Sequence, residues 1–332
     1  MRKVEWLYRI LDEETDERFG KEPSKRTLEE LKDTGIINVD KHIGPTSHLI
    51  SEDVKKILNL KKTGHIGTLD PNASGVLPVL LNKSTRLAPL FQKLDKEYVG
   101  VMHLHKDIDE SFLKEFIETK FIGKIKQTPP KRSAVARVLR ERYVYEAYLL
   151  EKDGKDVLFK IICESGFYVR KYVHDIGQKL KIGAHLKELR RVSIGKYNLE
   201  EKTYYKIFDE ENSISLFDLM KMLNSEEELR KIIKPAEYYL THVKKVFVKD
   251  TAIHNITLGA PLYVSGITRV QSDIRKNDLV AIFSLKNELV AFGVAVMDSV
   301  DMINSKEGIA VKIDRVFIDK NVYPRIGEIN KT

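Results

Sequence analysis

One acidic side chain, Asp70, lies in a loop whose residues suit close approach of the backbone to a ligand. The loop reads GHIGTLDP over residues 64–71, and GVLP follows at residues 75–78, with no second acid nearby. Glycines permit positive φ, and Pro71 fixes the backbone just after the acid. The apolar run at residues 76–81 is typical of a buried strand. We therefore expect a lone carboxylate at the mouth of a sheet, where a reacting group would be placed. The alternative is an Asp that caps its own turn.

The identity of these residues points to a family. The string GHIGTLDPNASGVLPVLLNKSTRL, at residues 64–87, closely resembles the signature of the TruB superfamily of pseudouridine synthases, in which this Asp is the catalytic nucleophile. Four further motifs match, and all five occur in the family's order along the chain. They are NVDK with GPTSH, together one motif within residues 38–48, KEY at 96–98, SGFYVR at 165–170 and LKELRR at 186–191. The resemblance covers about residues 36–200. One departure is His42, where a proline is usual, and it concerns the geometry of that loop.

The resemblance implies a definite reaction. Uridine becomes pseudouridine when the N1–C1′ bond breaks, the uracil rotates and C5 joins C1′. No atom is lost and no redox equivalent is used, so we expect neither a metal nor a cofactor, and the chain contains no Cys/His ligand cluster. The reaction needs a carboxylate at the sugar, a group that moves a proton and a dry pocket. The sequence is compatible with an acyl or a glycal intermediate at C1′.

Two side chains are predicted to act with Asp70. Arg170 lies at the start of the helix predicted over residues 169–180, off its apolar stripe, so it is free to point into the site. It carries a permanent charge and could hold the carboxylate at two points and keep it ionised. The alternative is a surface arginine. Tyr98 shares a predicted strand face with Gly100, Met102 and Leu104. Its ring is predicted to stack on the flipped uracil, with a hydroxyl that assists proton removal. The alternative is a core tyrosine.

Three further residues are assigned to substrate binding because they match the family's motifs. Leu189 is expected to line the apolar wall of the pocket, and one more core leucine is the alternative. His65 is expected near the extruded nucleotide, or else as a loop histidine that bonds its own backbone. Lys41 is expected to support the Asp70 loop, and a solvated lysine is the alternative.

Composition limits the class of protein. A chain of 332 residues is long enough for two domains, and 57 Lys+Arg against 49 Asp+Glu favour an anionic partner. The single cysteine, Cys163, excludes an internal disulfide and fits a reducing compartment. No apolar run approaches the roughly 18 residues that a membrane span needs. The N-terminus is too acidic for a signal peptide. We expect a cytoplasmic protein that does not act at a membrane.

The pattern of elements predicts an α+β fold. Helical spacing marks residues 46–60, a helix from Leu87 to Leu94, and residues 112–117 and 169–180. Strand patterns mark residues 98–104, 143–150 and 157–163, with a turn at residues 153–154 and a loop at 127–133. Strands and helices follow no simple βαβ repeat, which favours a mixed sheet. Residues 200–240 are acidic and helical in character.

From residue 243 onward, short apolar runs alternate with glycine, which predicts a small β-barrel. The segment LGAP at residues 258–261, followed by Gly266, resembles a PUA domain, an RNA-binding module. We therefore predict a charged extension over residues 1–35 that docks on the PUA-like domain, a TruB-like catalytic domain over 36–240 and a PUA-like domain over 241–325.

A target base must leave its stack, and this costs least in unpaired RNA. KTGH at residues 62–65, KEYVG at 96–100, the segment with PP and SAV at 129–135 and LRRV at 189–192 resemble dyskerin-like subunits of box H/ACA ribonucleoproteins, of the compact archaeal type. That resemblance implies an H/ACA guide RNA, rRNA and tRNA substrates, and partners of the GAR, small nucleolar and kink-turn-binding ribosomal types.

Two other functions stay open. A stand-alone tRNA pseudouridine synthase would read the shape of a tRNA arm without a guide. A non-catalytic RNA-binding scaffold would keep the fold, although it would need none of Asp70, Tyr98 and Arg170. A hydrolase of the glycosidase type is disfavoured because no second acid accompanies Asp70.

Overall fold

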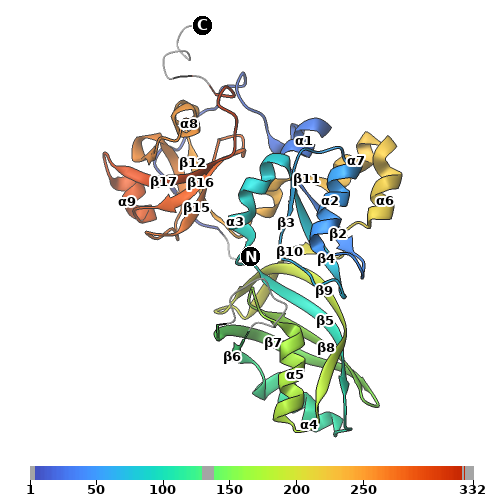
Figure 1. Ribbon diagram of the computed structural model, residues 1–332. Coiled ribbons are helices and arrows are strands. Elements are labelled where there is room, and N and C mark those ends of the chain that lie inside the picture. The colour runs from blue at the N-terminus through green and yellow to red at the C-terminus, as the bar shows by residue number, and fades with distance from the viewer. Residues whose placement is uncertain (1–3, 129–137, 324, 326–332) are drawn as a thin grey trace. The chain divides into compact units, whose positions relative to one another are not determined.

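The computed structural model describes residues 4–128, 138–323 and 325. Contacts divide the chain into two compact units, and Figure 1 shows their elements. One unit takes in the residues up to Ile36, Leu81–Leu87 and those from Ile233 onward, and the other holds Ile37–Leu80 and Ala88–Ile232. Every candidate site residue lies in the second unit. In the described residues, no helix has the length and apolar character needed to cross a membrane.

The second unit is built on a mixed sheet. Its strand order is β2 (Gly35–Lys41), β4 (Ala73–Leu81), β9 (Ala184–Asn198), β5 (Asp95–Leu104), β8 (Asp156–Cys163), β7 (Arg140–Asp153) and β6 (Gly123–Gln127). In addition, β3 (Thr63–His65) pairs with β4, and β10 (Thr203–Asp209) pairs with β9. Strands β4 and β9 are parallel, whereas β5 is antiparallel to both β8 and β9. The predicted α+β class with a mixed sheet is confirmed.

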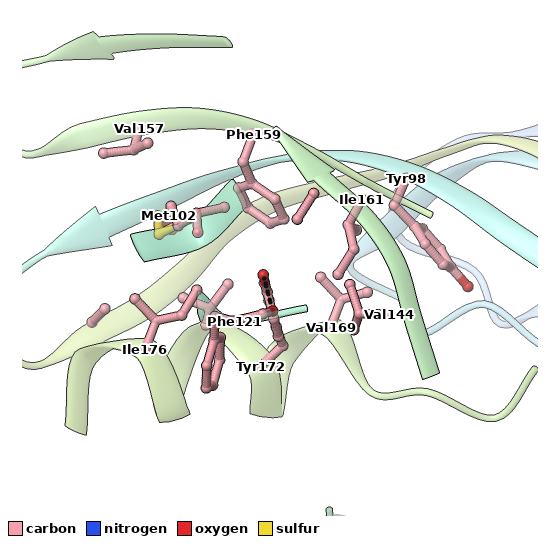
Figure 2. Close-up of a cluster of buried hydrophobic side chains, with 14 of the residues drawn as sticks. Tyr98, Met102, Phe121, Val144, Val157, Phe159, Ile161, Val169, Tyr172 and Ile176 are labelled. Carbon is pink, nitrogen blue, oxygen red and sulfur yellow. Dashed lines mark hydrogen bonds between the residues drawn. The ribbon is translucent and has the colours of Figure 1, made fainter. Parts of the chain in front are cut away.

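Helix α5 (Val169–Lys179) covers one face of this sheet. Its apolar stripe of Val169, Tyr172, Val173 and Ile176 is buried in one cluster with strand residues such as Met102 and Phe159. Figure 2 shows the helix side chains facing those of the strands across this core. The 3.6-residue spacing of the stripe is what lets one helix face meet a pleated sheet. This packing fixes the first turn of α5, which carries Arg170.

The unit has further helices besides α5. They are α2 (Ser47–Ile57), α3 (Ala88–Phe91), α4 (Glu110–Glu115) with a following π-turn (Phe116–Lys120), α6 (Leu216–Lys221) and α7 (Glu226–Ile232). Helix α2 begins after Thr46, whose side chain accepts a hydrogen bond from the N–H of Leu49, as an N-cap does. The helices predicted at residues 46–60, 112–117 and 169–180 are therefore present. The first is shorter than predicted, and the second begins earlier, at Glu110, and continues as a π-helix.

Three predictions about the elements need correction. The helix predicted through Leu87 to Leu94 is a 3₁₀ segment (Asn82–Leu87) followed by α3, because the next strand begins at Asp95. Residues 200–240 begin with β10 and only then become helical. The long strand β9 covers residues for which the sequence predicted no strand.

The loop predicted at residues 127–133 begins where β6 ends, at Gln127. Residues 129–137 lie outside the described residues, and so does the motif match at residues 129–135.

The first unit has its own sheet and core. Its strand order is β1 (Trp6–Tyr8), β14 (Ile267–Gln271), β12 (Lys244–Val248), β15 (Leu279–Phe283), β16 (Leu289–Ala295), β17 (Ile309–Val316) and β13 (Leu262–Tyr263). Two helices, α8 (Asp250–Thr257) and α9 (Ser299–Asn304), accompany it. The residues of α1 (Leu28–Thr34) and of the short strand β11 (Ile233–Pro235), which does not belong to this sheet, also fall in this unit. The short apolar runs predicted after residue 243 correspond to β12, β13, β15 and β16.

The N-terminal residues are part of this unit. Strand β1 pairs with β14, with Trp6 opposite Gln271. The Arg9 guanidinium donates to the carbonyl oxygens of Ile303 and Ser305, at 2.7 and 2.8 Å, at the end of α9. A charged segment with scattered aromatics becomes ordered here because the sheet edge supplies backbone partners for it.

Candidate active site

The loop that carries Asp70 joins β3 to β4 and is held by the NVDK/GPTSH segment. The Leu69 N–H donates to Ser47 Oγ at 2.8 Å, and the Ser47 hydroxyl donates back to the Leu69 carbonyl at 3.0 Å. The Gly44 N–H donates to the Pro71 carbonyl at 2.9 Å. Three hydrogen bonds therefore fix the chain on both sides of Asp70. This gives a physical reason why two motifs some twenty residues apart occur together.

Lys41 lies beneath the same loop and is fully buried. Its Nζ donates to the carbonyl oxygens of Ala73 at 2.7 Å, His42 at 2.9 Å and Pro71 at 3.3 Å. Burial lowers the pKa of Lys41, with the Arg191 guanidinium acting in the same direction. An ammonium has three donors, and here all three are used by carbonyl oxygens. The alternative of a solvated lysine does not describe this side chain.

Asp70 and Arg170 form an ion pair that solvent reaches. The Arg170 Nη2 donates to Asp70 Oδ2, and the two side chains are 54% and 60% exposed, respectively. The sequence predicted a grip at two points, whereas the contact joins one nitrogen and one oxygen. Helix α5 positions Arg170 as its second residue. The backbone before it is fixed by Gln127, whose side chain exchanges hydrogen bonds with the N–H and C=O of Tyr168 at 3.0 and 3.1 Å.

Tyr98 lies on β5 with its ring in the apolar cluster beneath the site. Only 9% of the residue is exposed, and Figure 2 shows its hydroxyl pointing away from the other side chains of the cluster. Burial raises the pKa of Tyr98, and the positive charge of the Arg191 guanidinium opposes that rise. Tyr98 is thus a buried tyrosine whose ring belongs to the apolar cluster and whose hydroxyl points out of it.

Arg191 is a buried cation that the sequence interpretation did not single out. It lies on β9, opposite Tyr98 of β5 on one side and Gly75 of β4 on the other, and it is fully buried. Its Nε donates to the Val76 carbonyl at 2.8 Å and its Nη2 to the Gly67 carbonyl at 2.6 Å. Burial lowers the pKa of Arg191. The Asp70 loop is therefore anchored from below by a guanidinium as well as by an ammonium.

Gly75 explains how three strands fit around Arg191. The glycine has φ of +104°, and a Cβ there would meet the Arg191 carbonyl oxygen at 2.1 Å. Only a residue without a side chain permits this approach. The glycine in the family signature is thus needed for the pairing of β4 with β9.

Lys96 is a second buried cation near the site that was not predicted. It precedes Tyr98 by two residues and so shares its face of β5. Its Nζ donates to Ser165 Oγ at 2.9 Å and also to the Leu94 carbonyl. Burial, with Arg191 second, lowers the pKa of Lys96 to about 8. The KEY motif contained the signal, since a lysine at i−2 from an inward tyrosine must also point inward.

His65 and Leu189 complete the candidate residues. His65 ends β3, and its Nε2 lies 3.0 Å from Thr68 Oγ1 rather than bonded to its own backbone. Burial lowers the pKa of His65, with Arg191 acting in the same direction. Leu189 is half-buried, packs against the apolar cluster, and lies on β9 between Ala73 and Gly100. Within the described residues, no group of three or more His, Cys, Asp or Glu is arranged to hold a metal ion.

Family models match nearly the whole chain. Residues 55–169 match the TruB family pseudouridylate synthase N-terminal domain, and residues 170–241 match the tRNA pseudouridylate synthase B C-terminal domain. Residues 244–317 match the PUA domain, and residues 5–51 match the DKCLD (NUC011) domain.

Individual proteins agree with these models. The "Probable tRNA pseudouridine synthase B" of Methanocaldococcus jannaschii is 45% identical over 325 residues, 96% of this chain and 93% of the relative. The protein of the same name from Pyrococcus furiosus is 44% identical, over 98% of this chain and 94% of the relative. The chain therefore belongs to the TruB family of pseudouridine synthases and is an enzyme of that class.

Solved structures define the branch of the family. A chain in the "Crystal Structure of a Cbf5-Nop10-Gar1 Complex" is 44% identical with a TM-score of 0.88, covering 98% of this chain and 97% of that one. A chain in the "Structure of H/ACA RNP bound to a substrate RNA containing 2'-deoxyuridine" is 41% identical with a TM-score of 0.87, covering 97% of both. Within the family, the chain is of the dyskerin-like, archaeal type.

Proposed function

We propose that this enzyme isomerises uridines chosen by base pairing with a box H/ACA guide RNA, in rRNA and also in tRNA. The observation that carries the proposal is the match, over 97% of both chains, to a structure described as an H/ACA RNP bound to a substrate RNA. A match of that extent takes in the PUA domain as well as the catalytic unit. In this arrangement sequence choice belongs to the guide, and the protein supplies the chemistry.

In the proposed reaction the target uridine flips out of its stack toward Asp70. The carboxylate acts at C1′ while the N1–C1′ bond breaks, and Arg170 keeps that carboxylate negatively charged. The exposure of both side chains gives an RNA backbone direct access to them. Tyr98 and Leu189 face the base with apolar surface, His65 lies beside the extruded nucleotide, and Lys41 holds the loop in place.

The remaining parts of the chain serve RNA and protein partners in this proposal. We assign residues 36–240 to catalysis, residues 241–325 to the PUA-like domain that binds the guide, and residues 1–35 to an extension docked on it. The β1–β14 pairing supports the docking of the extension. Partners of the GAR, small nucleolar and kink-turn-binding ribosomal types complete the particle. The single cysteine favours action in the cytoplasm.

Tritium release from 5-tritiated uridine tests this function. The purified protein is assayed on an rRNA fragment with and without a matching H/ACA guide and with the partner proteins. We expect release only when guide and partners are present, and none with a guide whose pairing segments are scrambled. Release at the same rate without any guide would contradict the guided role and leave the isomerase activity established.

A stand-alone activity on tRNA is the second candidate function. The relatives that carry the name tRNA pseudouridine synthase B favour it. The same assay on an unmodified tRNA transcript, with no guide, measures it directly. Guided turnover on rRNA that exceeds unguided turnover on tRNA would assign the main role to the guide.

A further inference from the structure

Gln127 is a buried side chain that connects the end of β6 to the start of α5. It is the last residue of β6 and is 2% exposed. Its amide oxygen accepts a hydrogen bond from the Tyr168 N–H at 3.0 Å, and its amide nitrogen donates to the Tyr168 carbonyl at 3.1 Å. A primary amide carries both a donor and an acceptor, so one side chain satisfies both polar backbone groups of a single residue. Gln127 thus holds Tyr168 at two points.

Tyr168 is the residue from which α5 starts. It is the N-cap of the helix, two residues before Arg170. Ser, Thr, Asp and Asn cap a helix with a short side-chain oxygen, which tyrosine lacks. The Tyr168 carbonyl accepts the first hydrogen bond of the helix, from the Tyr172 N–H at 3.0 Å, and the Gln127 amide donates to the same oxygen. Gln127 therefore fixes the backbone group on which the first turn is built.

The first turn of a helix needs such support more than its middle does. Its N–H groups have no acceptor four residues earlier, and Arg170 is the second residue of α5. Val169 and Tyr172 point into the apolar core in Figure 2 and set which way the helix faces. Apolar burial is non-directional, whereas two hydrogen bonds to one residue fix its place and its orientation. The core and Gln127 therefore contribute different constraints to the turn that carries Arg170.

The ion pair of Asp70 and Arg170 does not fix its own geometry. One nitrogen meets one oxygen, and both side chains are more than half exposed. An exposed pair of this kind contributes little free energy, so it cannot pull a loose helix end into place. The position of the guanidinium depends on the backbone beneath it. On the opposite side of the pair, Lys41 and Ser47 hold the Asp70 loop in the same way.

We propose that Gln127 is a positioning residue that sets the first turn of α5 so that the Arg170 guanidinium meets the Asp70 carboxylate. This inference rests on the proposed function, which places the chemistry at that pair. Gln127 is buried and acts through the Tyr168 backbone on Arg170. Displacing a catalytic group by about 1 Å can cost roughly a hundredfold in rate, so a residue remote from the reacting atoms can affect turnover.

A double-mutant cycle tests the inference in the assembled particle with its guide. We compare single-turnover rates for wild type, Gln127→Met, Arg170→Lys and the double variant. Methionine has a similar volume but makes neither hydrogen bond. We expect Gln127→Met to lower the rate about tenfold in the wild-type chain and less than about twofold beside Arg170→Lys, whose flexible point charge has no fixed geometry to lose. Equal losses in both backgrounds would mean that Gln127 only supports the fold.

Binding of the substrate RNA separates a positioning role from a general loss of structure. Gln127 is buried, so the affinity of the particle that contains Gln127→Met should stay within about twofold of wild type. A loss of affinity as large as the loss of rate would overturn the proposal.

Gln178→Met is the matched control. Gln178 lies on the same helix, and its side chain is exposed near the opposite end. We expect a change of less than about twofold in either background, as for other exposed positions. A loss equal to that of Gln127→Met would show that any change to α5 lowers the rate and would overturn the specific role of Gln127.

A backbone variant covers the case in which Gln127→Met does not fold. Tyr168 is replaced by its α-hydroxy acid counterpart, introduced at a stop codon, which exchanges the N–H that binds Gln127 for an ester oxygen. Every side chain stays, and so does the bond from Gln127 to the Tyr168 carbonyl. We expect the rate to fall about threefold, since one of two neutral hydrogen bonds is lost, and to change little beside Arg170→Lys. An unchanged rate, or the same factor in both backgrounds, would overturn the proposal.

Failure of this inference can be told apart from failure of the proposed function. If wild type makes no pseudouridine with or without a guide, the proposed function fails. If wild type is active and the Gln127 cycle is additive, only the positioning role of Gln127 fails.

Discussion

The site has an exposed part and a buried part, and they differ in almost every physical respect. Asp70 and Arg170 are more than half exposed and come from a loop and the first turn of a helix. Lys41, Lys96 and Arg191 are at most 6% exposed and come from strands of the sheet. The exposed pair has one contact between its members, whereas each buried cation has two or more partners.

This difference in exposure suits the two parts to different roles. An exposed ion pair contributes little to stability, so Asp70 and Arg170 are free to serve the reaction. Buried charges cost free energy and persist only where hydrogen bonds satisfy them. Here most of the acceptors are carbonyl oxygens of the Asp70 loop and of β4. The buried part therefore holds the loop, and in the proposed function the exposed part meets the substrate.

Asp70→Asn is expected to have the largest effect on activity. The amide keeps the size of the side chain but has no negative charge to place at C1′, so turnover falls at least about a thousandfold. RNA affinity depends mainly on phosphate contacts and should change less than about twofold. Single-turnover tritium release and filter binding measure the two. Residual activity within tenfold of wild type would refute the role of Asp70.

Lys41→Met tests the buried part. Methionine fills a similar volume but donates no hydrogen bonds, so three carbonyl oxygens lose a charged partner. We expect the free energy of unfolding in urea to fall by about 3 kcal/mol, with activity lost as the loop loosens.

Lys56→Met is the control for this variant. Lys56 lies on α2, and its side chain is 76% exposed with one distant partner. Its replacement should change stability by less than about 0.5 kcal/mol. Similar losses for the two lysines would show that burial of Lys41 does not support the loop.

Much of the exposed part could be predicted from the sequence. Asp70 stood out because it was a lone acid between glycines and proline, and Arg170 because it lay at the start of a predicted helix, off its apolar stripe. Motif order then linked them across a hundred residues. The two-point grip was not borne out, because a contact geometry depends on how α5 is seated on the sheet, and periodicity carries no such information.

Most of the buried part could not be predicted in the same way. Arg191 follows Arg190 in the sequence, and one is fully buried while the other is half-exposed in surface ion pairs. The two differ only by the alternation of β9, a strand that the sequence did not reveal. The burial of Lys96 could have been predicted, because Tyr98, two residues later on the same strand, was predicted to point inward.

Lys96 gives the buried part a pH dependence that can be measured. Its pKa is lowered to about 8 in the folded chain, below the usual 10.4 of an unfolded one. Between these values the unfolded state binds more protons, so stability rises with pH. We expect the free energy of unfolding of wild type, relative to Lys96→Met, to increase by about 2 kcal/mol from pH 7 to pH 10. Urea titrations of both proteins at each pH measure it, and a constant difference would contradict the lowered pKa.

Arg170→Lys is expected to have the smallest effect, and it separates the exposed part from the buried part because it should lower activity without lowering stability. Lysine keeps the positive charge near Asp70 but loses the planar fork and its fixed reach, so turnover should fall about tenfold. Stability should stay within about 0.5 kcal/mol of wild type, because the pair is exposed. Lys171→Arg, one residue further along α5, is the matched control. Its partner is Asp175 on the same helix, so activity should not change. A stability loss as large as that of Lys41→Met would show that Arg170 belongs to the scaffold and that the two parts are one.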